Sequence, residues 1–359
     1  MAYTTIKNPK LHFNTVLYTG NNSSPRTITG VGFQPDMNWS KIRSTTNDHW
    51  LSDVVRGSNK IIRPNGQDDE LVNGSGGYIS AFNADGYVIA AGSANNANFN
   101  LNNGTMASWN WKAGGSQGSS NTDGSINTTY TSVNTTAGFS ISQYTGTASA
   151  GATIGHGLGA VPSMIITKNY GRSGGAGNWI VYHKALGNTK YLVLNDTAAQ
   201  GSSAGAWNNT TPTSSVFTVG DFDSTNGSEG MVAYCFAEKT GYSKFGTYVG
   251  NGNADGNFVY TGFKPAFVIA KNATSSGYSW ELFDNKRNLT DGVGNVIQKR
   301  LYPDSSAAEG GSASTDYIDF LSNGFKIRRA GDSNENGSTY IFMAFAEEPL
   351  IGDNPATAR

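Results

Sequence analysis

A candidate metal site is the run DSNENG, which places Asp332, Asn334 and Asn336 at alternate positions before Gly337. Oxygen-bearing side chains with this spacing open a calcium loop, because Ca²⁺ takes several oxygen ligands and the glycine permits a sharp turn. An EF-hand loop also needs a bidentate glutamate, at a position where this chain has Met343. The pattern therefore favours an Asn/Gly hairpin loop without metal, and calcium bound by these three residues is the alternative.

A candidate phosphate-binding loop is the stretch YVGNGNADGNFVYTGFKPAFVIAK, in which Gly250, Gly252 and Gly256 precede an apolar run. Glycine-rich loops cradle phosphate where they open a helix, because the helix N-terminus presents free N–H groups and partial positive charge. The sequence predicts no long helix after these glycines, and the two related stretches described below do not keep their spacing. Nucleotide binding is therefore not expected.

Histidine and cysteine give little support to zinc binding or nucleophilic catalysis. The histidines, His12, His49, His156 and His183, form no metal-binding spacing, and no Gly-x-Ser-x-Gly elbow is present. Cys235 lies in the apolar run MVAYCFAE, which favours a small buried hydrophobe. His156 lies in GHGLG, where a hydrogen bond at the edge of a turn is expected.

The composition indicates a folded, turn-rich chain without a strong charge. Charged residues make up 14% of 359 residues and the net charge is -1, so no basic surface is expected to hold nucleic acid or an anionic membrane. The 46 glycines suit tight turns, and 37% hydrophobic content suits a buried core. The opening MAYTTIKNPK has no apolar signal region, and no apolar run is long enough for a membrane span. We therefore expect synthesis in a cytoplasm and no membrane insertion.

Three copies of one pattern follow one another along the chain. The stretches LYTGNNSSPRTITGVGFQPDMNWSK, QYTGTASAGATIGHGLGAVPSMIITK and TYVGNGNADGNFVYTGFKPAFVIAK align at a tyrosine, a proline and a lysine. The aligned residues are Tyr18, Tyr144 and Tyr248, then Pro35, Pro162 and Pro265, then Lys41, Lys168 and Lys271. Downstream, RPNGQDDE, VLNDTAAQ and YPDSSAAE occupy one position, and the copies close with MASWNW, MVAYCF and TYIFMAF. This self-similarity predicts three tandem domains.

The repeats set the domain boundaries. We predict an N-terminal arm at 1–11, domains at 12–113, 139–238 and 244–349, and a C-terminal tail at 350–359. The Gly/Ser/Thr-rich residues 114–138 are predicted to form a linker or extended arm, and residues 239–243 a short linker. The short linker indicates that the second and third domains lie close together.

Periodicity predicts an all-β fold. Runs such as MIITK and FVIAK are almost continuously apolar, as in strands buried on both faces, and the closing strands are rich in aromatic and β-branched residues. Helical periodicity is nearly absent, and only Asp53 to Lys60 or Asp304 to Glu309 could hold a helical turn. Strands that recur about every 8–12 residues favour three tandem antiparallel β-sandwich domains of jelly-roll or lectin-like type.

Acidic residues that recur between copies are interpreted as scaffold. Glycoside hydrolysis needs two carboxylates across a groove, and Asp53, Asp284 and Glu309 are the candidates. Each recurs or has a near-equivalent in another copy, and a chain seldom needs one active site in triplicate. Asp53 and Arg56, like Asp284 and Arg287, are spaced as a local ion pair that pins a turn. The second copy lacks this pair, so folding does not require it. We predict no catalytic residues and no enzymatic activity.

The combined motifs resemble a repeat found in predicted virion proteins of marine tailed bacteriophages. The resemblance is carried by VGFQPD, DVVRG and WNWKAGG in the first copy, by GFSISQYTG and IGHGLG in the second, and by the ending EEPLIGDNPATAR. It spans nearly the whole chain and implies a tail-fibre-like or capsid-surface protein with lectin-like β-sandwich domains. The first copy departs from the pattern at Asn38 and Ser40, where an apolar strand is expected.

The resemblance implies a structural protein on the virion surface, as a tail fibre or tail appendage involved in host attachment, or alternatively as a capsid decoration. Expected partners are other virion proteins, a host-surface glycan and further copies of the chain, with a trimer favoured for a fibre. Met1 to Lys10 and Leu350 to Arg359 lie outside the repeats and are candidates for docking onto the particle. Trp179 and Trp280 occupy equivalent positions, which favours core anchors over glycan-stacking rings. A lectin-like module and a polysaccharide-degrading spike are the alternative functions, and the sequence does not define the ligand-binding residues.

Overall fold

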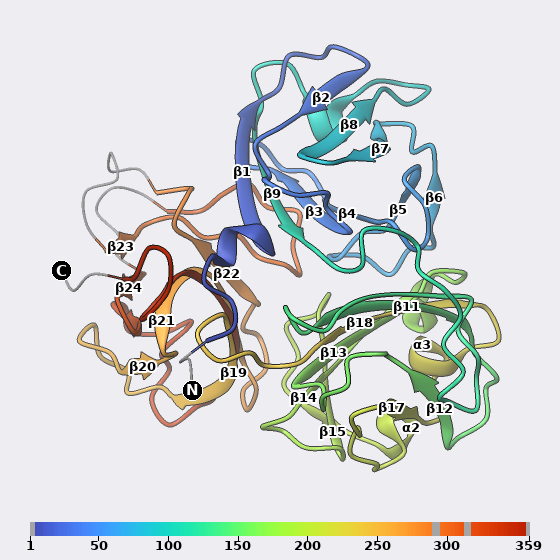
Figure 1. Ribbon diagram of the computed structural model, residues 1–359. Helices are drawn as coiled ribbons and strands as arrows, with labels where there is room; N and C mark the ends of the chain where they lie inside the picture. The colour runs from blue at the N-terminus through green and yellow to red at the C-terminus, as the bar shows by residue number, and fades with distance from the viewer. Residues whose placement is uncertain (1–3, 289–294, 312–316, 357–359) are drawn as a thin grey trace.

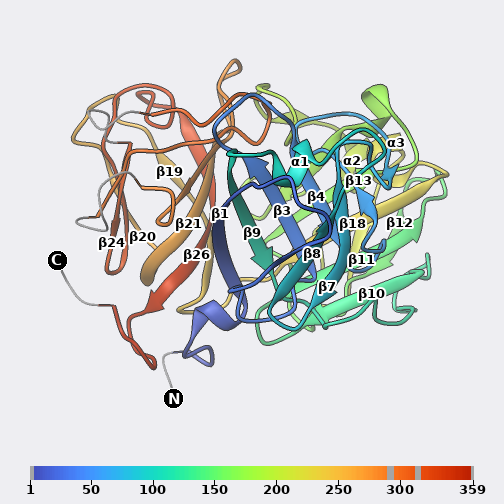
Figure 2. The same cartoon turned by 90° about the horizontal axis from the view of Figure 1, so that it is seen from above.

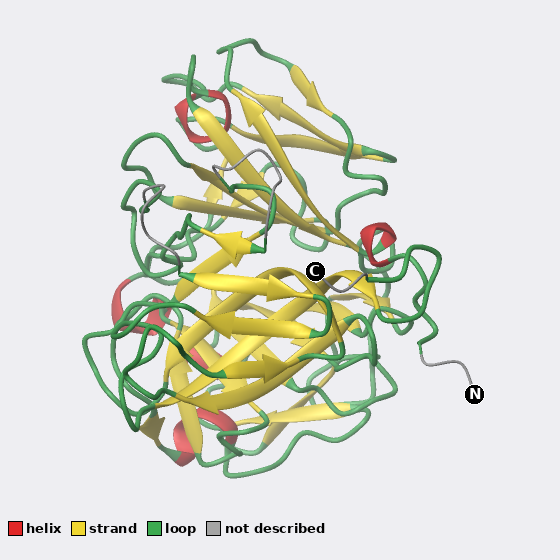
Figure 3. Ribbon diagram, turned by 90° about the vertical axis from the view of Figure 1, so that its left-hand side faces the viewer, coloured by secondary structure: helices red, strands yellow, loops and turns green. Residues whose placement is uncertain are grey.

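The protein is all-β, as the periodicity predicts. The computed structural model describes residues 4–288, 295–311 and 317–356, and Figure 3 shows that strands dominate it. The helical elements are single turns: η1 (Pro9–Leu11), α1 (Ala97–Asn100), η2 (Gly174–Gly177), α2 (Ala204–Trp207) and α3 (Asp223–Asn226). The two runs that could hold a helical turn, after Asp53 and after Asp304, form turns and loops instead.

Three sheets contain the same antiparallel arrangement of four strands, which we call the inner sheets. Their orders are β1-β9-β3-β4, β11-β18-β13-β14 and β19-β26-β21-β22. The first comprises β1 (Phe13–Thr19), β3 (Met37–Ile42), β4 (His49–Asp53) and β9 (Thr105–Trp111). The second comprises β11 (Phe139–Thr145), β13 (Met164–Asn169), β14 (Trp179–His183) and β18 (Gly230–Phe236). The third comprises β19 (Ser243–Val249), β21 (Phe263–Asn272), β22 (Glu281–Asp284) and β26 (Thr339–Pro349).

The pairing registers of the inner sheets also agree. Met37 pairs with Trp111 and Asp53, Met164 with Phe236 and His183, and Phe267 with Phe345 and Asp284. Trp111, Phe236 and Phe345 are therefore equivalent positions, and so are Asp53, His183 and Asp284.

The second inner sheet is wider than the other two. It is extended on one side by β10 (Tyr130–Asn134) and on the other by β15 (Lys190–Val193) and β16 (Gly201–Ser202), giving a seven-stranded sheet. Strand β10 lies within residues 114–138, for which the sequence predicts a linker or extended arm, and it pairs along its length with β11.

Smaller outer sheets cover the inner sheets. They are β2-β8-β7, β12-β17 and β20-β25-β24-β23, with the hairpin β5-β6 beside β4. Their bounds are β2 (Arg26–Ile28), β5 (Lys60–Ile61), β6 (Leu71–Val72), β7 (Tyr78–Asn83), β8 (Gly86–Ala90), β12 (Ala152–Gly155), β17 (Val216–Val219), β20 (Phe258–Tyr260), β23 (Val296–Ile297), β24 (Ile318–Leu321) and β25 (Gly324–Ile327). Separate buried clusters fill the spaces between inner and outer sheets. Cys235 is buried in the second of these spaces, as expected of a small hydrophobe.

The inner sheets turn their other faces toward one another and share a single hydrophobic core. Figure 1 shows the three groups of strands around a common centre, and one cluster of buried side chains contains residues from all three groups. We call it the central core. Each inner sheet is therefore buried on both faces, because its alternating side chains pack into the central core and against an outer sheet. This accounts for the continuous apolar runs MIITK and FVIAK.

Aromatic rings from equivalent positions meet in the central core. The ring centroid of Phe345 lies 5.8 Å from that of Trp111 and 6.1 Å from that of Phe236. Phe13 packs beside them, 4.8 Å from Trp111 and 5.2 Å from Phe345. Such ring pairs stabilise a core beyond the area they bury.

Asn38 and Ser40, which break the apolar pattern of the first copy, belong to a buried polar network. The Asn38 amide donates to Asn110 Oδ1 (2.7 Å), and the Ser40 hydroxyl donates to Asn38 Oδ1 (2.6 Å). Asn110 in turn donates to Ser108 Oγ (3.2 Å). The polar groups satisfy one another across β3 and β9, so the strand keeps its place in the inner sheet with polar side chains at these two positions.

The described residues nearest the two ends of the chain, around Lys7 and Asp353, lie together beside the third inner sheet (Figure 2). Ile6 is buried in the central core, and η1 contacts β26. The Asp353 N–H donates to the Lys7 carbonyl (3.1 Å). The start of the chain therefore packs against its last strand.

Replacing Phe345 with alanine should lower the free energy of unfolding by about 3–5 kcal/mol, because the truncation leaves a cavity where the three inner sheets meet. Chemical denaturation measures this change. The matched control is Phe258→Ala, at a side chain that is 46% exposed, which should change the stability by less than about 0.5 kcal/mol. Equal effects of the two substitutions would contradict a shared core at Phe345.

Candidate functional site

Hydrogen bonds between the chain segments 12–113, 139–238 and 244–349 repeat in a cycle. The donors are backbone N–H groups in the loops that come after β5, β15 and β23. The acceptors are the carbonyls of the residues that directly follow β13, β21 and β3, and each acceptor belongs to a different segment from its donor. The three bonds are Glu70 N–H to Tyr170 O (2.8 Å), Gln200 N–H to Ala273 O (2.9 Å) and Glu309 N–H to Arg43 O (2.9 Å). The first segment thus contacts the second, the second the third, and the third the first. The contacts form a closed ring.

The two tryptophans expected to be core anchors add to this ring. Trp179 and Trp280 are each 1% exposed. The Trp179 indole donates to the Arg63 carbonyl of the first segment, and the Trp280 indole donates to the Val193 carbonyl of the second, both at 2.9 Å. Their burial favours the core-anchor interpretation, since neither indole N–H is available to a glycan.

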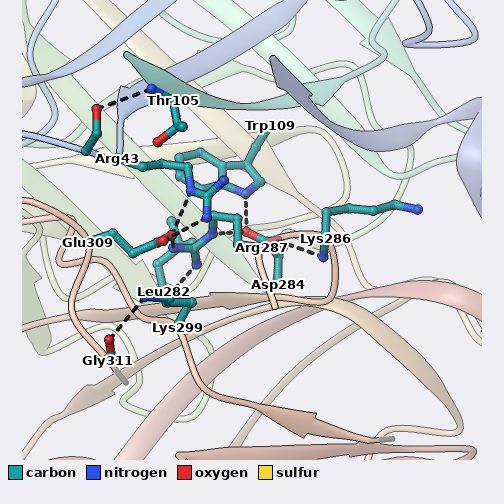
Figure 4. A network of polar contacts seen from close by, with 11 residues as sticks. Arg43, Thr105, Trp109, Leu282, Asp284, Lys286, Arg287, Lys299, Glu309 and Gly311 are labelled. Atoms are coloured by element: carbon teal, nitrogen blue, oxygen red, sulfur yellow. Dashed lines mark hydrogen bonds and ion pairs between the residues drawn. The ribbon is translucent and has the colours of Figure 1, made fainter. Parts of the chain in front are cut away.

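The Asp284 carboxylate accepts a hydrogen bond from a residue of another segment (Figure 4). The Trp109 indole donates to Asp284 Oδ2 (2.9 Å), which also pairs with Arg287 Nε (2.5 Å). Arg287 then pairs with Glu309 (2.9 Å), and Glu309 pairs with Arg43 of the first segment (2.8 Å). The carboxylates raise the pKa of Arg287 against the effect of burial. A chain of ion pairs therefore joins the third segment to the first.

Asp53 has the same arrangement at the interface of the first and second segments. The Tyr234 hydroxyl donates to Asp53 Oδ2 (2.6 Å), Arg56 Nε pairs with the same oxygen (2.6 Å), and Arg56 Nη1 pairs with Glu70 (2.7 Å). Burial, with Asp53 beside it, raises the pKa of the Tyr234 hydroxyl well above its usual value, so this hydroxyl stays a donor. Asp53 and Asp284, the acids considered above for hydrolysis, are both fully buried in these contacts.

The third interface explains why the second copy lacks Asp-Arg. Trp109, Tyr234 and Met343 are equivalent, because they pair with Thr15, Ile141 and Phe245 at matching positions. Methionine has no N–H or O–H to donate, so an aspartate in this place would have no donor from the third segment. His183 stands there instead, with Nε2 3.3 Å from the Phe342 carbonyl.

The lysines that mark the repeats are buried and bind backbone oxygens. Lys41 Nζ donates to the Ile42 carbonyl (2.7 Å), Lys168 Nζ to the Gly177 carbonyl (2.5 Å) and Lys271 Nζ to the Thr197 carbonyl (3.0 Å). Burial lowers the pKa to about 8 for Lys41 and Lys271 and to about 7 for Lys168. Their recurrence in all three segments indicates a scaffold role.

Two of the three calcium candidates already use their side-chain oxygens in contacts within the protein. Asn334 is buried, its Oδ1 accepts the Asn251 N–H (3.0 Å), and its amide donates to Asn251 and Asn253. The Asp332 carboxylate pairs with arginines of the same segment, and Asn336 is exposed. Among residues 4–288, 295–311 and 317–356, no three His, Cys, Asp or Glu side chains gather closely enough to hold a metal ion.

His156 forms the hydrogen bonds expected at the edge of a turn. Its ring is buried, Nε2 lies 3.2 Å from the Thr213 carbonyl, and Nδ1 accepts the Leu158 N–H (3.2 Å). Burial lowers its pKa.

A small pocket in the third segment has charged residues at two wall positions where the other segments have uncharged ones. Its cavity of about 160 Å³ is lined by Gly277, Tyr278, Ser279, Glu281, Arg300, Tyr302 and Asp332, and we call it the polar pocket. The residue after the ring-contacting Trp280 is Glu281, whereas Ile180 follows Trp179 and Trp50 follows His49. Arg300 precedes Leu301, whereas Tyr191 precedes Leu192 and Ile61 precedes Ile62 in the equivalent strands.

Arg300 organises the polar pocket. Its Nη1 pairs with Glu281 Oε1 and with Asp332 Oδ2 (2.8 Å). Its guanidinium lies over the Tyr302 and Tyr317 rings, 5.0 Å and 4.5 Å from their centroids. This arrangement fixes two carboxylates, one cation and an aromatic face around one small cavity.

Two polar atoms of residues that line the polar pocket are themselves inaccessible to solvent. Glu281 Oε2 and Arg300 Nε are buried and form no hydrogen bond of standard geometry with the described residues. Burial raises the pKa of Glu281, against the opposing effect of Arg300, and it raises the pKa of Tyr302 to about 12. Sequence reasoning missed the site, and the available signal was the replacement of apolar residues by charged ones at repeat-equivalent positions.

The fold and these sites define an all-β protein of antiparallel sheets whose segments repeat one set of contacts. A family model described as a domain of unknown function, DUF7483, matches residues 8–349, so the chain belongs to that family. No curated protein and no solved structure matches the chain. Within the described residues, no helix has the length and apolar character needed to cross a bilayer.

Replacing Tyr234 with phenylalanine should lower the free energy of unfolding by about 1.5–3 kcal/mol, because the buried Asp53 carboxylate loses a donor from the neighbouring segment. Urea denaturation measures the change. The control is Tyr260→Phe, at a side chain that is 56% exposed, which should be near neutral. If Tyr234→Phe matches this control, the contact does not hold the segments together.

His183 should make the protein less stable as the pH falls from about 6.5 to 4. Burial lowers the pKa of His183 to about 4, so over this range the unfolded chain takes up a proton that the folded chain does not. The loss attributable to this residue is about 3 kcal/mol and is complete below the folded-state pKa. The measurement is the free energy of unfolding across this pH range. The slope should flatten in His183→Gln and persist in His12→Gln, at a partly buried site; an unchanged slope in His183→Gln would refute the assignment.

Proposed function

We propose that residues 12–113, 139–238 and 244–349 are three tandem β-sandwich domains, of jelly-roll or lectin-like type, that close into a ring. Support comes from the shared strand order and register of the inner sheets. The cyclic hydrogen bonds supply independent support, because they join equivalent residues of successive domains. Residues 114–138 then connect the first two domains and contribute β10 to the second, and residues 239–243 connect the second and third.

The proposed role of this ring is that of a bacteriophage virion structural protein without enzymatic activity, displayed as a tail fibre or tail appendage and involved in host attachment. The observation that carries the proposal is the closure of the three domains on one central core. It gives a rigid body whose recurring acids, Asp53 and Asp284, hold domains together. The sequence resemblance to virion proteins of tailed phages supplies the location. Capsid-surface decoration is the alternative location for the same structural class.

The termini provide the proposed attachment to the particle. Lys7 and Asp353 hydrogen-bond to each other, so residues 4–11 of the arm and residues 350–356 of the tail lie on one side of the ring. One face can therefore dock onto other virion proteins while the rest of the ring is exposed to the host. A homotrimer is the proposed assembly for a fibre, and the cyclic arrangement within one chain supports a monomer on a threefold axis as the alternative.

Antibodies against the whole chain should label intact, purified particles of the phage whose genome encodes it, and electron microscopy should place the label on the tail. Label on the capsid would favour decoration, and absence from purified particles by mass spectrometry would refute a virion role. A chain shortened to end at residue 349 should be incorporated less than a chain with Phe258→Ala, which leaves both termini intact.

A further inference from the structure

We infer that the edge strand β20 (Phe258–Tyr260) of the third segment is a surface on which a second copy of this chain docks. The two copies pair their β20 strands in antiparallel orientation around a twofold axis, so that two outer sheets become one continuous sheet. The contact goes beyond the proposed function. It is separate from the trimer proposed for a fibre, because a twofold contact joins chains in pairs.

The outer side of β20 pairs with no other strand among the described residues. It is the first strand of the sheet β20-β25-β24-β23, and Figure 1 shows it at the outside of the third segment. The Asn257 carbonyl accepts an N–H from β25 (3.2 Å), and the Thr261 N–H donates to the carbonyl just before β25 (3.0 Å). Backbone groups in an antiparallel strand alternate in direction, so Phe258 and Tyr260 direct their N–H and C=O groups away from β25. The edge is a template for another strand.

The equivalent edge in the second segment is covered by part of the same chain. Strand β12 is equivalent to β20, because each pairs with a strand that has a phenylalanine at the matching position. The Ile126 N–H donates to the Thr153 carbonyl (3.0 Å), and the Thr153 N–H donates to Ser125 Oγ (2.9 Å). Thr153 is equivalent to Phe258. The fold therefore accepts an additional extended segment at this edge, through the backbone groups that point outward at Phe258.

The outward side chains of β20 depart from the repeat. In the first two segments the equivalent outward positions hold small residues, which are Thr27, Thr29, Thr153 and Gly155. The third segment has Phe258 and Tyr260 there, with exposed fractions of 46% and 56%. Strand β20 also contains neither a charge nor a proline, the features that commonly keep a sheet edge from associating. Two aromatic rings on an open, uncharged edge indicate a surface that an assembly covers.

The occupant that fits this edge is a second β20. Residues whose backbone groups point toward the partner strand must lie opposite one another in an antiparallel pair. With Val259 opposite its own copy, Phe258 lies opposite Tyr260 at both ends of the contact, and every outward backbone group of the strand is used. The same register places a phenylalanine ring beside a tyrosine ring on the exposed face, which is a favourable cross-strand pair. A register shifted by two residues would leave one residue of each strand unpaired.

The charges beside the edge do not oppose this pairing. Lys326 lies next to Phe258 in the sheet, and its ammonium group pairs with Asp255. These two residues therefore add no net charge to the contact.

The size of the contact sets its strength. A strand of three residues buries much less than the roughly 1,200 Å² of a stable interface, so the copies associate weakly and reversibly. Copies held side by side on a larger assembly would pair more completely, because a short link raises the effective concentration to the order of 1 mM.

Sedimentation velocity of the full chain, from about 10 µM to about 1 mM, tests the inference. We expect a monomer at the lowest concentration and a reversible dimer with a Kd of about 0.1–1 mM. Phe258→Lys should weaken association at least tenfold, because the contact would bury an unpaired charge. The matched control is Val72→Lys, at a 55% exposed side chain on the hairpin β5-β6, which should leave the Kd unchanged.

Hydrogen–deuterium exchange measured by mass spectrometry locates the contact. A higher protein concentration should slow exchange in a peptide that contains residues 257–261 and should not affect a peptide that contains β2. Thermal unfolding of dilute protein should show that both lysine variants remain as stable as the wild type, since both positions are exposed.

The inference is overturned if the chain stays monomeric at about 1 mM, if Phe258→Lys dimerises like the wild type, or if protection appears at another edge instead. Protection of residues 257–261 only in assembled particles would assign the edge to a different virion protein, and this also overturns docking of a second copy. None of these results alters particle labelling, so the two proposals fail separately.

Discussion

The structure depends on buried carboxylates that need a hydrogen-bond donor from a neighbouring segment. Asp53 and Asp284 have no exposed surface, and each receives an aromatic N–H or O–H from another third of the chain. A buried carboxylate that loses a partner costs several kcal/mol. The apolar faces of the inner sheets impose the same requirement, because they would face water if the segments separated. The three segments must therefore fold onto one another rather than lie along the chain like beads.

This constraint distinguishes residues that maintain the contacts between segments from residues whose type can vary between equivalent positions. Trp109, Tyr234 and Met343 occupy equivalent positions in the three inner sheets. The tryptophan and the tyrosine each donate a hydrogen bond to an aspartate of another segment. Methionine has no donor, and the residue at the position equivalent to these aspartates is a histidine. The spaces beneath the outer sheets are not shared between segments, so their composition can drift without breaking the ring. The polar pocket lies in such a space.

Much of the fold could be predicted from the sequence, because strand period, turn residues and internal repetition are local signals. The aligned Tyr and Lys positions fall at equivalent places in the inner sheets, and the Asp53–Arg56 and Asp284–Arg287 pairs form as their spacing indicates. Contacts between segments could not be predicted, since nothing local shows that Trp109 reaches Asp284. The pocket was missed because Glu281, Arg300 and Asp332 are far apart in sequence. The family membership adds no function, so the biological role rests on the proposals above.

The account's central claim is that three segments fold as one unit around the central core, and scanning calorimetry of the intact chain tests it most directly. Closure predicts a single transition whose calorimetric enthalpy equals the van't Hoff enthalpy, because no segment can open without exposing the shared core. Three resolved transitions, or a calorimetric enthalpy about three times the van't Hoff value, would show domains that melt independently. That result would contradict the ring.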